Sequence, residues 1–154
     1  MSTIKERLKK QITAGKIKFD AGSEQRLEDE LLGDNAGVKV TETLQSLVLE
    51  LSSKVASHVR VSDLIRDGDE GHHGKGRAVD IGNEGIAGEL LPQVATDAKV
   101  AELKIDEIIF DAGIPSSGQA DRNKWNYDQG VKHDYDEDTT LIEHQDHIHF
   151  SVKV

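Results

Sequence analysis

Two histidine-rich segments, far apart along the chain, constrain its fold more than any other feature. The segment EGHHGKGRAVDIGN at residues 70–83 combines adjacent histidines with several glycines and an aspartate, and the last ten residues read QDHIHFSVKV. Five of the seven histidines lie at residues 72–73 and 144–149. A site that uses both segments requires a fold that brings them together.

Any metal site in this chain has to be built from His, Asp and Glu, because the sequence contains no cysteine. Catalytic zinc commonly takes three such ligands and leaves one position open. Only the two histidine-rich segments together supply such a set. In the second segment His147 and His149 are two residues apart, so on a strand both side chains project from the same face.

The charge balance disfavours several classes of partner. The chain has 29 acidic and 19 basic residues and a net charge of −10, whereas nucleic acids and anionic membranes require a basic face. The first 15 residues are charged and lack an apolar segment, so we expect no secretory signal. No apolar run approaches the length needed to span a membrane.

The apolar pattern predicts a single domain of the α+β class. Helices are expected at residues 3–13, 23–32 with a Ser N-cap, 41–57 with Thr41 as the cap, and 92–103 with Pro92 in the first turn. Strands are expected at residues 15–20, 58–66, 106–111 and 147–154. The expected architecture is a helical N-terminal part, residues 1–57, and a metal-site part, residues 58–154, with a small antiparallel sheet.

Residues 111–140 form a long polar segment without periodicity, which is typical of disorder or of a functional loop. The segment contains the only tryptophan and both tyrosines. We therefore expect an ordered loop that forms one wall of a substrate cleft. Trp125 is expected to anchor this loop or line the cleft, in a substrate-binding role, rather than lie in the core.

The first histidine-rich segment has the pattern H-x-x-G-x-A-x-D, formed by His73, Gly76, Ala78 and Asp80. The glycine permits a close backbone approach or a bulge, and the alanine leaves room. The aspartate then falls on the following strand, turned back toward the histidine.

HGKGRAVDIGN, together with DHIHF near the C-terminus, resembles the family of zinc D-alanyl-D-alanine carboxypeptidases and L-alanyl-D-glutamate endopeptidases. That family shares its fold with lysostaphin-type peptidases and the hedgehog domain. Its pattern has six residues between a ligand His and a ligand Asp, as between His73 and Asp80. An acidic base then stands three residues before another ligand His, as Asp146 does before His149. The resemblance covers residues 59–154.

The resemblance implies a role for each matched residue. One zinc ion per chain would be bound by His73, Asp80 and His149. Asp146 would be the general base that activates water for attack on a peptide carbonyl. His147 matches a catalytic histidine of the lysostaphin-type relatives, and would stabilise the oxyanion or share the proton transfer. Arg66, upstream of the first ligand, would pair with a substrate carboxylate.

Structural roles for the same residues remain open alternatives. His73 and Asp80 could belong to a polar loop, Asp146 to a turn, and His147 to a satisfied structural contact. His72 is expected beside the site or facing solvent. His58, His133 and His144 are expected at the surface or in loops.

The acidic segments DGDEG and DYDEDTT suggest calcium loops. A calcium loop of the EF-hand type that starts at Asp134 would need Gly where Thr139 stands and Glu where Gln145 stands. Solvated acidic loops fit these segments better.

The expected function is a zinc metallopeptidase that hydrolyses peptide bonds in the stems or crosslinks of bacterial peptidoglycan. Such a cell-wall hydrolase, for example a phage endolysin or an injected effector, would be made in the cytoplasm and reach the wall after lysis or delivery. The alternatives are a zinc-containing binding module without catalysis and a structural component of a phage tail or injection apparatus.

Overall fold

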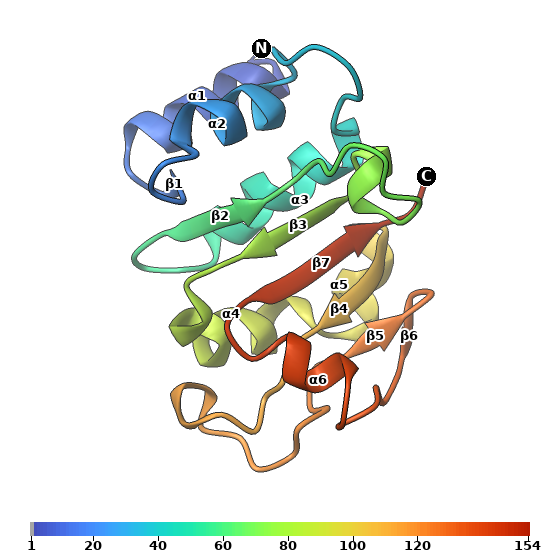
Figure 1. Ribbon diagram of the computed structural model, residues 1–154. Coiled ribbons are helices and arrows are strands. Elements are labelled where there is room, and N and C mark those ends of the chain that lie inside the picture. The colour runs from blue at the N-terminus through green and yellow to red at the C-terminus, as the bar shows by residue number, and fades with distance from the viewer. Residues whose placement is uncertain (1) are drawn as a thin grey trace.

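The computed structural model describes residues 2–154 and has a seven-stranded sheet with helices packed around it (Figure 1). The strands are β1 (Ile17–Phe19), β2 (Val59–Asp63), β3 (Ala78–Ile81), β4 (Ile105–Ile109), β5 (Tyr127–Asp128), β6 (Val131–Lys132) and β7 (Ile148–Val152). The helices are α1 (Ile4–Thr13), α2 (Glu24–Leu32), α3 (Glu42–Ser53), α4 (Ala87–Val94), α5 (Asp97–Glu102) and α6 (Thr140–Glu143). Three short 3-10 turns are η1 (His73–Lys75), η2 (Glu84–Ile86) and η3 (Pro115–Ser117). The α+β class is therefore confirmed.

The sheet is larger than the expected small antiparallel sheet, and it is mixed. Its strand order is β1-β2-β3-β7-β4-β5-β6. β1 pairs with β2 in parallel, and all other neighbours are antiparallel. The expected small antiparallel sheet is corrected in two ways. The N-terminal part adds the parallel strand β1 at one edge, and the segment after β4 enlarges the sheet with a hairpin at the other.

The two faces of the central strands differ in character. Val79 and Ile81 of β3 and Phe150 of β7 lie in the hydrophobic core, on the face covered by helices α3, α4 and α5 (Figure 1). The residues that alternate with them, Asp80 and His149, project from the opposite face. The same alternation that builds the core therefore places polar side chains together on the other side of the sheet.

Helix α3 follows its sequence signals closely. Leu44, Leu47, Val48 and Leu51 are fully buried along one stripe, and the Thr41 hydroxyl accepts a hydrogen bond from the Leu44 amide. One core cluster contains residues of the N-terminal helices as well as residues of the sheet. The N-terminal part thus packs directly on the strands that carry the histidines.

The expected helix at residues 92–103 is wrong. Helix α4 begins at Ala87, so Pro92 lies inside it, and the helix ends two residues later at Val94. A separate helix, α5, begins after Thr96, whose side chain accepts a hydrogen bond from the Lys99 amide. Thr96 is the signal in the sequence for the start of α5. A capping threonine marks the beginning of a helix just as a proline in the first turn does.

The segment at residues 111–140 is more structured than expected. It contains the η3 turn and the β5–β6 hairpin, which extends the sheet beyond β4. β5 and β6 have only two residues each, too short for a period-two pattern to be visible in the sequence. Across residues 2–154, none of the helices combines the length and the apolar character needed to cross a membrane.

Candidate metal centre

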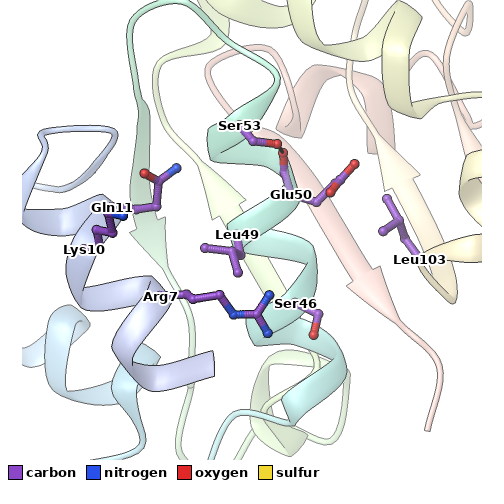
Figure 2. A pocket seen from close by; sticks show the side chains of 8 residues that line it. All are labelled: Arg7, Lys10, Gln11, Ser46, Leu49, Glu50, Ser53 and Leu103. Carbon is purple, nitrogen blue, oxygen red and sulfur yellow. Dashed lines mark hydrogen bonds between the residues drawn. The ribbon is translucent and has the colours of Figure 1, made fainter. Parts of the chain in front are cut away.

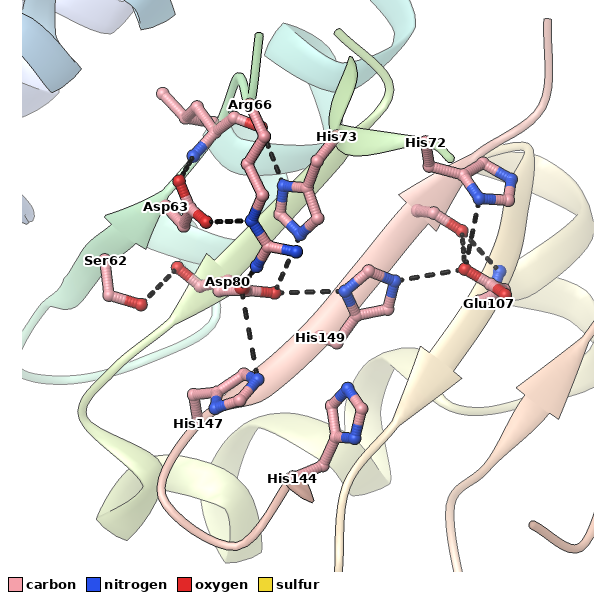
Figure 3. Close-up of polar contacts among 12 residues, drawn as sticks. Ser62, Asp63, Arg66, His72, His73, Asp80, Glu107, His144, His147 and His149 are labelled. Atoms are coloured by element: carbon pink, nitrogen blue, oxygen red, sulfur yellow. Dashed lines mark hydrogen bonds and ion pairs between the residues drawn. The ribbon is translucent and has the colours of Figure 1, made fainter. Parts of the chain in front are cut away.

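His73, Asp80 and His149 converge on the polar face of the sheet (Figure 3). One ligand atom from each lies within 4.8 Å of the others, and all three residues are buried. The structure thus joins the two histidine-rich segments, and this group could hold a metal ion.

Strand pairing explains why Asp80 and His149 meet. Asp80 of β3 lies directly opposite His149 of β7 in the antiparallel register, so the two side chains are neighbours on one face. His149 Nδ1 lies 3.0 Å from Asp80 Oδ1, and His73 Nε2 lies 3.3 Å from the same oxygen. These separations are close to the edge of a tetrahedron around zinc, about 3.3 Å for bonds of about 2.0–2.1 Å.

The His73 ring is oriented by the backbone, which leaves Nε2 without a proton and 3.3 Å from Asp80 Oδ1. His73 Nδ1 lies 2.7 Å from the carbonyl oxygen of Leu64, to which it donates its proton. His73 Nε2 is buried and has no hydrogen-bond partner. A buried imidazole nitrogen without a partner is costly unless something binds there. The donor set of two imidazoles and one carboxylate, with this free nitrogen, fits zinc.

Asp80 and His149 also perturb each other's protonation. Burial acts to raise the pKa of Asp80, but the His149 hydrogen bond and the neighbouring His73 outweigh it and hold the pKa well below its usual range. Burial acts to lower the pKa of His149, but its contacts with Asp80 and Glu107 raise it to about 9. The carboxylate is therefore ionised and ready to act as a ligand.

Asp146 and His147 form a pair at the rim of this cluster. His147 Nδ1 lies 2.8 Å from Asp146 Oδ1, and His147 Nε2 lies 4.0 Å from Asp80 Oδ2. The Asp146 side chain is 89% exposed, and its hydrogen bond to His147 lowers its pKa. His147 thus stands between Asp146 and the three-residue cluster.

His144 lies in the turn that follows α6, as expected of a loop residue, and it is also part of this neighbourhood. Its ring centroid lies 4.9 Å from that of His147 and 5.7 Å from that of His149. Its Nδ1 lies 2.6 Å from the Thr140 carbonyl oxygen, and burial lowers its pKa. His58 lies in the loop before β2, and His133 is exposed and stacks edge-on against Tyr135.

Arg66 lies next to the cluster and contacts carboxylates of its own chain. Its Nε donates to Asp63 at 2.6 Å and one terminal nitrogen donates to Asp80 Oδ2 at 3.2 Å. A third carboxylate, that of Asp69, lies 3.7 Å away. The guanidinium thus holds Asp80, a candidate metal ligand, and its binding of a substrate carboxylate remains a prediction.

Trp125 is a core residue, which corrects the expected position. It is 6% exposed and belongs to the hydrophobic core cluster, so its ring offers almost no surface to a ligand. The ring attaches the 111–140 segment to the body of the protein, which agrees with the expected anchoring role and not with a cleft wall. An aromatic ring suits this packing role because it buries a large area, about 150–250 Å².

Two residues near the cluster were not assigned a role from the sequence. Glu107 Oε1 lies 3.0 Å from His149 Nε2. Burial acts to raise the pKa of Glu107, but the contact with His149 outweighs burial and lowers this pKa to about 2. His72, expected beside the site or in solvent, lies beside it, with Nε2 2.8 Å from Asp106 and Nδ1 3.3 Å from Glu107. The sequence signal that could have pointed to Glu107 is the pair of acidic residues at the start of the otherwise apolar segment DEIIF.

A separate surface cavity of about 500 Å³ lies between α1 and α3 (Figure 2). It is lined by charged and polar side chains such as Arg7 and Lys10 and by the apolar Leu49 and Leu103. None of its lining residues belongs to the three-residue cluster. The cavity and the cluster are therefore distinct features.

Comparisons with family models, with curated proteins and with solved structures found no match to this chain.

Proposed function

We propose that this protein is a zinc-dependent hydrolase that cuts peptide bonds in bacterial peptidoglycan. The observation that supports the metal centre is the convergence of His73, Asp80 and His149, with a buried imidazole nitrogen left free. The choice of peptidoglycan peptides as substrate rests on the resemblance of the two sequence motifs. The bond that is cut, in a stem or in a crosslink, is left to the experiment.

In this proposal the three-residue cluster holds the metal. When bound, zinc supplies Lewis-acid chemistry: it polarises a carbonyl oxygen and makes water easier to deprotonate. Asp80 brings one negative charge, and the hydrogen bond from His73 Nδ1 to Leu64 directs Nε2 toward Asp80. Burial of all three side chains keeps bulk water away from the ligand atoms.

The proposed proton transfer uses the Asp146–His147 pair. Asp146 accepts the hydrogen bond of His147 Nδ1, which leaves Nε2 as the nitrogen nearest the cluster. His147 Nε2 can take a proton from attacking water while Asp146 orients the ring and stabilises its charged form. This arrangement divides between two residues the general-base role that the resemblance implies for Asp146.

A non-catalytic zinc-containing module is the second candidate. The observation that favours it is the 89% exposure of the Asp146 side chain, which lies on the solvent side of His147. Such a module would bind zinc and cell-wall peptides and release no fragments.

The deciding experiment is digestion of purified peptidoglycan by the zinc-loaded protein, with mass spectrometry of the released fragments. We expect stem or crosslink peptides to be released, and both Asp146→Ala and His147→Ala to lower the rate by about 10²–10⁴-fold with zinc retained. Glu143→Ala is the matched control, since it removes an exposed carboxylate three residues before Asp146. A folded, zinc-loaded wild-type protein that releases no fragments contradicts the enzyme and supports the binding module.

A further inference from the structure

We propose that Glu107 is a positioning residue of the metal centre, which holds the His149 imidazole so that Nδ1 faces the cluster. This inference deepens the proposed metal centre and rests on it, but does not depend on hydrolysis. Glu107 lies on β4, outside both histidine-rich segments, and is not one of the three converging ligands.

His149 lies between two carboxylates (Figure 3). Its Nδ1 is 3.0 Å from Asp80 Oδ1, and its Nε2 is 3.0 Å from Glu107 Oε1. Without a metal, both nitrogens face carboxylate acceptors and can each carry a proton. A metal bound by Asp80 and His73 would replace the proton on Nδ1, and the one proton left on the ring would stay on Nε2, facing Glu107.

Glu107 is itself held in place from two directions. The Ser151 hydroxyl donates to Glu107 Oε1 at 2.8 Å and accepts from the Glu107 amide at 3.1 Å, because the two residues are partners in the β4–β7 register. His72 Nδ1 lies 3.3 Å from the same carboxylate oxygen, and Asp106 fixes the other side of that ring. The carboxylate therefore has little freedom to leave His149.

This arrangement matches the second layer of known metal sites. A metal-binding histidine commonly donates its other N–H to a carboxylate, which fixes the tautomer and makes the ligand nitrogen more basic, and loss of that partner typically lowers metal affinity 10–100-fold. A residue that only stabilises the sheet would lower the folding stability without this selective effect on the metal.

The test compares Glu107→Ala, Glu107→Gln and the control Glu102→Ala. Glu102 is an exposed carboxylate that pairs with Lys99, away from His149 and His72. Zinc affinity is measured without substrate by competition with a chromogenic chelator, and thermal unfolding of the metal-free proteins checks the fold. The imidazole nitrogen signals of His149 are recorded by NMR on the zinc-loaded proteins.

We expect Glu107→Ala to weaken zinc binding about 10–100-fold and to remove the hydrogen-bonded Nε2–H signal of His149. Glu107→Gln, whose amide oxygen still accepts a hydrogen bond, should keep that signal and lose less affinity, and Glu102→Ala should bind zinc as the wild type does. The proposal is overturned if folded Glu107→Ala binds zinc as tightly as the wild type, or if Glu102→Ala loses as much affinity. Normal zinc binding with no peptidoglycan cleavage would overturn the proposed enzyme and leave the role of Glu107 intact. A wild-type protein that binds no zinc would overturn the metal centre and this role with it.

Discussion

The single residue Gly76 controls the placement of His73, a candidate metal ligand. It ends the η1 turn that begins with His73, and its φ is +70°. A Cβ atom at this position would lie 2.2 Å from the Lys39 carbonyl oxygen and 2.9 Å from the Val40 Cα. The close backbone approach predicted from the H-x-x-G pattern is therefore confirmed, and only glycine fits here.

Gly118 provides a matched control for this effect. It ends the η3 turn with the same φ of +70°, but an added Cβ would meet nothing within 4 Å. We expect Gly118→Ala to cost about 1–2 kcal/mol of folding stability through the left-handed conformation alone. Gly76→Ala should cost more, about 3 kcal/mol or above, because the adjoining backbone must also move. Urea unfolding of both metal-free variants measures the difference, and equal costs would show that the contact with Lys39 is unimportant.

At the scale of elements, Asp111 connects the end of β4 to the polar segment and to the start of β7. Its carboxylate accepts hydrogen bonds from Arg122 at 2.7 and 3.1 Å and from the Gln145 amide at 3.2 Å. The Asp111 side chain is 3% exposed, and the Arg122 guanidinium holds its pKa below its usual range. Asp111 thus ties residues 111–140 to the strand that carries His149.

Asp111 should also contribute to acid sensitivity. Because the pKa of Asp111 is lowered in the folded state, the carboxylate stabilises the fold fully above its unfolded pKa of about 3.9. This stabilisation is lost as the pH falls through the pKa of the folded state. We expect Asp111→Asn to be less stable at pH 7 by about 1–3 kcal/mol, and this gap to shrink as the pH falls below about 4. Urea unfolding of the metal-free wild type and Asp111→Asn between neutral and acid pH measures this difference in folding stability. Glu137→Gln alters a more distant and exposed partner of Arg122 and should be as stable as the wild type at each pH. A stability loss in Asp111→Asn that stays constant across this pH range would contradict the role of the Asp111 carboxylate in acid sensitivity.

The elements differ in how far they could be predicted from the sequence. Helix α3 was predictable because its apolar stripe and its Thr41 cap are local signals. The α4–α5 boundary could not be placed from Pro92, because this proline lies inside α4 and the cap that starts α5 is Thr96. The β5–β6 hairpin was missed because its pairing with β4 depends on contacts between strands, and not on a pattern within two-residue strands.

For the whole molecule, the sequence predicted the joining of the two histidine-rich segments but not what surrounds them. The motif spacing identified His73, Asp80 and His149, which the structure brings together. Glu107 and His144 were missed because only the tertiary fold places them beside His149. Trp125 was misplaced because a polar sequence neighbourhood does not reveal burial in the core.

The pairing of β3 with β7 is the step that creates the candidate centre, since it sets Asp80 opposite His149 across residues far apart in the chain. The claim that these strands and the η1 turn build one metal site is central to this account. It depends on His73 as much as on the strand pair, because His73 alone contributes a ligand from outside the sheet.

The most direct test is the zinc content of purified, folded protein, measured by elemental analysis for the wild type, His73→Ala and His133→Ala. His133 is exposed and stacks edge-on against Tyr135, away from the cluster, so its variant controls for the loss of any histidine. We expect one zinc per chain in the wild type and in His133→Ala, and a sharp loss in His73→Ala. Stoichiometric zinc in His73→Ala, or no zinc in the wild type, would contradict the account.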